Sequence, residues 1–92
     1  MNHGLSERAA AVLAAMSAEA PETFTATVRT RTGVTAAHER GTVPPGAGPV
    51  DEWGDVFDLD VPGRPVLVEW FAGDPESVTF TRITWLADTP QG

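Results

Sequence analysis

Cysteine is absent from this 92-residue chain. A disulfide framework, a zinc ribbon and a thiol nucleophile are therefore excluded, and a small apolar core has to stabilise the fold alone. A chain of this length makes one domain, and such a domain buries only roughly 60 to 70 per cent of the surface that the unfolded chain exposes. We therefore expect a single domain over residues 1–92 that gains stability by forming a homodimer.

Lysine is absent as well, so the six basic residues are all arginine, and they face 13 acidic residues for a net charge of −7. The negative excess lies in residues 51–92, which carry nine acidic residues against Arg64 and Arg82. An acidic surface repels a phosphate backbone. We therefore expect no nucleic-acid partner, and instead another protein with a basic surface.

A basic leader segment and a long apolar run are also missing. The alanine-rich run near the amino terminus is interrupted by Met16, Ser17 and Glu19. Neither a signal peptide nor a membrane-spanning helix has this pattern. The sequence therefore predicts a cytoplasmic protein without membrane contact.

The first element that is present is an amphipathic helix, expected over residues 6–20. Ser6 is a favourable N-cap, and Glu7 places a negative charge in the first turn, where it suits the helix dipole. Pro21 ends the helix in this interpretation. One stripe is apolar at spacings of three and four residues: Leu5, Ala9, Val12, Leu13, Met16 and Ala20.

The segment after Pro21 has the pattern of strands. Residues 23–32 alternate in side-chain direction as a half-buried strand does, with Phe24 and Val28 on the inner face. Gly33 would turn the chain, and residues 34–40 would return as a short edge strand.

The arginines of this segment support two interpretations. On a strand, Arg29 and Arg31 would lie opposite acidic residues of a neighbouring strand, Asp58 and Asp60. Alternatively, the residues from Thr32 to Thr35 resemble the turn of a helix-turn-helix motif, and the arginines would contact DNA. The many β-branched residues and the net charge both oppose this alternative.

Residues 41–49 are rich in glycine and proline and are expected to form a loop. A half-buried strand over residues 57–61 follows, with its apolar side chains on one face. The sequence Val61-Pro62-Gly63-Arg64 fits a type II turn, because proline suits its second position and glycine accepts the positive φ of its third.

The most apolar part of the chain is a predicted β-hairpin over residues 65–86. Its first strand carries bulky apolar side chains on both faces. In its second strand Phe80 and Ile83 have opposite parity. Either a β-bulge near Thr81-Arg82 restores the register, or the strand buries different faces at its two ends. One helix covers only one face of a sheet, so the second face needs another cover. The choices are the loop rich in proline and glycine together with Trp53, curling of the sheet into a small barrel, or another protein molecule.

These elements predict an α+β fold, with an amino-terminal helix packed on a twisted antiparallel sheet of four to five strands. Because tryptophan dominates interaction hot spots, the Trp-bearing sheet face is the expected partner surface. Its interface candidates are Trp53, Trp70, Ile83 and Trp85. An acidic rim is expected around it, made by Asp51, Glu52, Asp55, Asp58 and Asp60.

Patterns for catalysis and metal binding are weak. Ser6, Ser17 and Ser77 fall in a cap, a helix and a turn, and none has a base beside it in a known motif. His3 and His38 lack clustered ligands, and the acidic residues lack the spacing of a calcium loop. We therefore expect no metal, no cofactor and no catalytic residue, which leaves an enzyme as the less favoured class.

The resulting hypothesis is a small, acidic, non-catalytic protein-interaction module, such as a regulator, an inhibitor, or an immunity-type or phage-type accessory protein. A small-molecule-binding or enzymatic α+β cup is the first alternative, and a DNA-binding regulator is the second. A deep apolar pocket with an inward acid or histidine would favour the first alternative.

Overall fold

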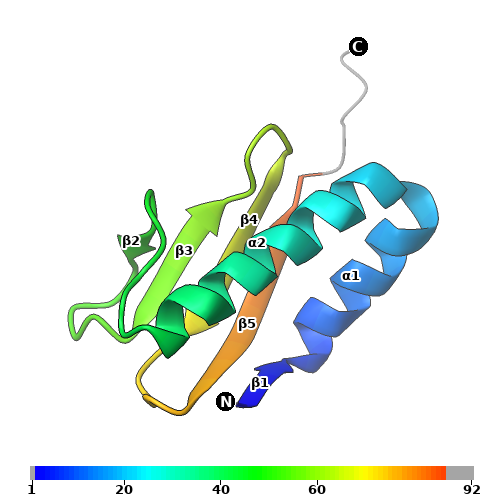
Figure 1. Cartoon of the computed structure of the whole chain (residues 1–92). Helices are drawn as coiled ribbons and strands as arrows, with labels where there is room; N and C mark the ends of the chain where they lie inside the picture. Colours follow the sequence, from blue (N-terminus) through cyan, green and yellow to red (C-terminus); the bar gives the residue numbers. More distant parts are fainter. Residues whose placement is uncertain (1, 87–92) are drawn as a thin grey trace.

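The computed structural model of the chain describes residues 2–86. Its strands form one sheet in the order β1-β5-β4-β3-β2, and both helices cover the same face of that sheet (Figure 1). β1 runs parallel to β5, and the other neighbours are antiparallel. The predicted α+β fold is confirmed, with a second helix added. In chain order the elements are β1 (Asn2–Leu5), α1 (Glu7–Glu19), α2 (Pro21–Glu39), β2 (Gly48–Pro49), β3 (Val56–Asp60), β4 (Val66–Phe71) and β5 (Ser77–Trp85).

The helix α1 begins at the predicted cap. The Ser6 hydroxyl oxygen accepts a hydrogen bond from the Ala9 N–H at 3.0 Å and donates one to the Thr81 carbonyl at 2.9 Å. The cap therefore also fastens the helix to β5. On the inner stripe, Leu13 and Met16 are buried.

The predicted strands over residues 23–32 and 34–40 are wrong, because residues 21–39 form the single helix α2. Pro21 follows α1 and also occupies the first turn of α2, where its missing N–H leaves no helical bond unmade. The side chains that α2 buries follow helical spacing: Thr23, Thr27, Val34 and Ala37.

The continuity of α2 overturns both interpretations of its arginines. Because the helix runs through Gly33, the turn of a helix-turn-helix motif does not form there. Arg29 and Arg31 lie on a helix, so they do not face Asp58 and Asp60 across a sheet. Among residues 2–86 the one ion pair joins Arg64 to Glu22, at 3.4 Å.

Gly41 terminates α2 in a left-handed conformation, with φ at 74°. The Gly41 N–H donates to the His38 carbonyl at 3.0 Å, and the Thr42 N–H donates to the Ala37 carbonyl at 2.9 Å. This pair of bonds is the Schellman motif, which stops a helix. The following loop is shorter than predicted, because Gly48 and Pro49 pair with β3 at the sheet edge, where proline is tolerated.

The hairpin of β4 and β5 contains the predicted bulge. Glu69 pairs with Arg82 and Trp70 pairs with Phe80, so Thr81 is the extra residue. The shift allows Phe80 and Ile83 to point to the same buried side in spite of their opposite parity. The turn before β4 also forms, with the Arg64 N–H bonded to the Val61 carbonyl at 3.1 Å and Gly63 at a φ of 73°.

The core lies between the two helices and the covered face of the sheet. It joins α1 and α2 to β4 and β5, and its largest fully buried side chains are Trp70, Phe80, Met16 and Ile83. The Phe80 ring centre lies 6.3 Å from that of Trp70, which in turn stacks on Phe57 at 6.0 Å. The sheet face opposite the helices takes no part in this core.

Candidate functional site

The sheet has one face that neither helix covers, called here the open face (Figure 1). The strand registers give this face both apolar and charged residues. The strand registers place Leu67, Glu69 and Phe71 of β4 on it, because the alternate residues of that strand are buried under the helices. Phe71 is 39 % exposed, large for an aromatic residue inside a strand. The neighbouring strands add Val56, Asp58, Asp60, Thr79, Arg82 and Thr84 to the open face.

Phe71 rests on the backbone of Gly73. The space beside the Gly73 Cα is filled by the Phe71 ring, so a Cβ at this position would collide with it. This contact holds an exposed aromatic ring in one place.

Residues 51–55, called here the Trp53 turn, present a second exposed aromatic side chain. Trp53 is 76 % exposed. One carboxylate oxygen of Asp51 accepts hydrogen bonds from the N–H groups of Asp55, at 2.9 Å, and Val56, at 3.1 Å. These bonds order the backbone that carries Trp53.

The Trp53 turn lies beside the open face. The Ala72 N–H donates to the Asp55 carbonyl, and Val56 pairs with Phe71 across β3 and β4. The backbone of the turn is therefore joined to the aromatic end of β4 by a hydrogen bond and by strand pairing. The apolar members near this end of the sheet are Val50, Trp53, Val56 and Phe71.

The four interface candidates named from the sequence do not lie together on one exposed face. Trp70 is 1 % exposed and Ile83 is 2 % exposed, so both belong to the core beneath the helices. Trp85 pairs with Val66 on the covered face and is half-buried. Of the four candidates, Trp53 is the one with a large exposed area.

The predicted acidic rim falls into two groups. Asp51, Glu52 and Asp55 belong to the Trp53 turn, and Asp58 and Asp60 belong to the open face by register. Sequence reasoning missed Phe71 and Leu67 as surface residues. The available signal was that β4 is apolar on both faces while one layer of helices covers only one of them.

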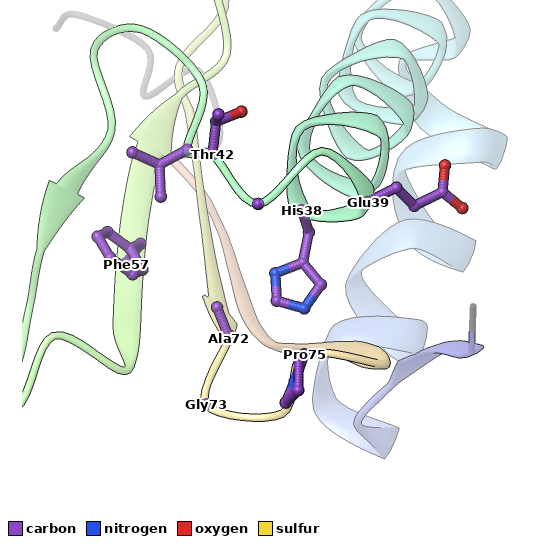
Figure 2. A pocket seen from close by; sticks show the side chains of 9 residues that line it. His38, Glu39, Thr42, Phe57, Ala72, Gly73 and Pro75 are labelled. Atoms are coloured by element: carbon purple, nitrogen blue, oxygen red, sulfur yellow. The ribbon is translucent and has the colours of Figure 1, made fainter.

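A separate cavity of about 710 Å³ lies between the end of α2 and the loop after β4 (Figure 2). His38 extends from α2 toward Pro75, and its Nε2 lies 2.7 Å from the Asp74 carbonyl. Because a carbonyl only accepts, Nε2 carries the proton in this contact. Glu39 also lines the cavity but points away from the His38 ring, so the two do not form an acid–base pair.

Within residues 2–86, no three histidine or acidic side chains come together in an arrangement that could hold a metal ion. Within the same residues, neither helix combines the length and the apolar character that crossing a membrane requires.

Comparison with family models, curated proteins and solved structures found no match.

Proposed function

We propose that this chain is a non-catalytic protein-interaction module, which binds a basic protein surface through the Trp53 turn and the open face. The observation that carries the proposal is Trp53, 76 % exposed on a hydrogen-bonded turn beside an uncovered sheet face. Tryptophan is among the side chains most enriched in binding hot spots.

The rigidity of the turn supports a binding role. The Asp51 carboxylate already fixes the backbone around Trp53, and Gly73 already fixes the ring of Phe71. A partner therefore has less backbone conformational entropy to remove when it binds to the Trp53 turn. Trp53 and Phe71 supply exposed aromatic surface near this end of the sheet, and the buried centre of protein interfaces is enriched in such side chains.

The charges around the apolar centre favour a basic partner over a second copy of the chain. The open face carries Asp58, Asp60 and Glu69 against Arg82, and the Trp53 turn adds three further acidic residues. In a two-fold symmetric dimer this surface would meet itself, with acidic residues close to acidic residues. We therefore propose a hetero-complex at this surface, in which basic residues of the partner surround its pocket for Trp53.

The experiment starts with affinity capture from the native cells using the wild-type chain and the Trp53→Ala variant. A protein retained by the wild type is then purified and titrated against both, with the heat of binding measured by isothermal titration calorimetry as the signal. We expect Trp53→Ala to weaken binding by about thirtyfold, which corresponds to the loss of a hot spot of about 2 kcal/mol. Its melting temperature should stay close to that of the wild type, because the side chain is exposed.

Two controls separate this proposal from its alternatives. Glu19→Gln, on the helical side, should leave affinity unchanged, whereas Asp58→Asn with Asp60→Asn should weaken it and reduce its salt dependence. Sedimentation at micromolar concentration should give a monomer. A dimer that Trp53→Ala dissociates would assign the surface to a second copy and contradict the hetero-complex.

A further inference from the structure

Arg31 has an environment that the interaction surface does not explain. It projects from α2 toward the covered face of the sheet, and its Cζ lies 4.9 Å from the centre of the Phe80 ring. This is a cation–π distance. Burial lowers the pKa of the Arg31 guanidinium, which is desolvated by the helix and sheet around it.

The guanidinium has no counter-ion among residues 2–86. The ion pair in this part of the chain belongs to Arg64, and the Arg31 Nε is buried without a hydrogen-bond partner. The two Nη groups make no hydrogen bond to a described residue either, and they are not buried as Nε is. An unpaired, partly buried cation costs free energy, which an incoming anion would offset.

A cavity of about 370 Å³ opens beside Arg31, between β1 and the second half of α2. His3 of β1 lines one wall, and Val28 and Ala36 supply apolar surface on the other. The two threonines of the lining donate their hydroxyl hydrogens to helix carbonyls, so they offer no donor to a ligand. Arg31 and His3 are therefore the donors that face this space.

We infer that this cavity binds the carboxylate group of a small aliphatic acid, held by the Nη groups of Arg31. A guanidinium presents two parallel N–H donors that match the two oxygens of a carboxylate. The apolar wall of Val28 and Ala36 suits a short alkyl chain. Glu39 also lines the cavity, and together with the net charge of −7 it opposes a ligand with more than one negative charge.

The carboxylate could belong to a free acid or to the carboxyl terminus of a peptide. The test titrates the ¹⁵N-labelled full chain, followed by amide NMR, with three probes: sodium propionate, a tripeptide ending in Ala-Val, and the same tripeptide amidated at its end. Saturable shifts of the Val28, Arg31 and Ala36 amides are expected with propionate. A tighter response to the free tripeptide than to propionate, lost on amidation, would identify a peptide terminus as the source.

Matched variants tie the response to the guanidinium. Arg31→Gln should weaken propionate binding by at least about tenfold, since a hydrogen bond to a charged group is lost. Arg29→Gln removes an exposed arginine of the same helix and should leave binding unchanged. Trp53→Ala should also leave propionate binding unchanged. The carboxylate site and the proposed interaction surface can therefore be tested independently of each other.

Three results would overturn the inference. The first is a response to propionate no larger than that to sodium chloride at equal ionic strength. The second is unchanged binding of propionate by Arg31→Gln, with circular dichroism showing that the variant is folded. If that variant does not fold, Arg31→Lys is measured in its place. Unchanged binding by Arg31→Lys would show that the planar guanidinium does not hold the carboxylate. The third is tighter binding of phosphate than of propionate.

Discussion

The helix α2 is rich in threonine, a residue of low intrinsic helix propensity, and its threonine hydroxyl groups form hydrogen bonds within the helix. Five of its six threonines donate the hydroxyl hydrogen to the carbonyl four residues earlier, from Thr25 to Thr35. Such bonds are available only within a helix and leave the threonine hydroxyl satisfied even when it is buried. Thr27, which is fully buried, shows the benefit, because its hydroxyl bonds the Thr23 carbonyl at 2.8 Å and contacts the Met16 sulfur at 3.4 Å.

Substitution by alanine should have opposite effects at two glycines, Gly33 inside α2 and Gly41 at its end. Gly33 is exposed inside α2, and an added Cβ would meet nothing within 4 Å, so Gly33→Ala should raise the free energy of unfolding by about 0.5 to 1 kcal/mol. Gly41 has a φ of 74°, so Gly41→Ala should lower it by about 1 kcal/mol. Urea unfolding of both variants measures the two changes. A loss of stability in Gly33→Ala would contradict a continuous helix and restore a turn at that position.

The bulge in β5 decides which side chains of the hairpin face the core. Thr81 is the extra residue between the pairs Trp70–Phe80 and Glu69–Arg82. Its hydroxyl lies 3.1 Å from a Glu69 carboxylate oxygen, and its carbonyl accepts from Ser6. The extra residue therefore supports the cap of α1 and adds a local bond to β4.

Deletion of Thr81 is a sharp test of this arrangement. Without it the ladder becomes regular, and Phe80 and Ile83 still face the core, so we expect a folded variant that loses only about 1 to 2 kcal/mol with the two hydrogen bonds. Deletion of Thr79, also a threonine of β5, would reverse the direction of Val78 and should cost more than about 3 kcal/mol. Thermal unfolding followed by near-ultraviolet circular dichroism compares the two. Equal losses would mean that the bulge does not set the register.

The elements that the sequence predicted correctly are those fixed by local chemistry. The Ser6 cap, the Pro62-Gly63 turn and the parity change at Thr81 each depend on a few adjacent residues. The strand β1 was missed because it exists through parallel pairing with β5, at the far end of the chain. The helix α2 was missed because alternating Thr and Ala side chains fit a strand, while the helical stripe from Thr23 to Ala37 becomes apparent only when packed.

The candidate site was predictable in part for the same reason. Trp53, flanked by acidic residues and Gly54, could be assigned to an exposed turn from its neighbours alone. Trp70 and Ile83 could not be assigned to the core, because β4 is apolar on both faces and its sequence does not say which face the helices cover. That choice depends on where α1 and α2 pack, which is a property of the assembled fold.

Few of the acidic residues that the structure describes are paired with a basic residue. Residues 51–86 carry eight acidic residues and two arginines, and the single ion pair among the described residues, Arg64 with Glu22, is exposed. An exposed pair contributes little to stability, so salt has little favourable attraction to screen. Repulsion among the acidic residues of β3, β4 and the Trp53 turn is then the main electrostatic contribution to folding that salt can change.

The melting temperature should therefore rise with sodium chloride. Between about 10 mM and about 150 mM the Debye length falls from about 30 Å to about 8 Å, which screens the acidic half from itself. Relief of roughly 0.5 kcal/mol would raise the melting temperature by about 2 to 4 °C in a domain of this size. Asp58→Asn with Asp60→Asn should reduce this rise of the melting temperature.

Glu7→Gln with Glu19→Gln is the matched control. It removes the same charge from α1 and should preserve the rise, because those carboxylates lie outside the acidic half. A melting temperature that falls with salt, or two double variants that respond alike, would show that the repulsion is not concentrated on the sheet side, and the charge argument for a basic partner at the open face would lose its support.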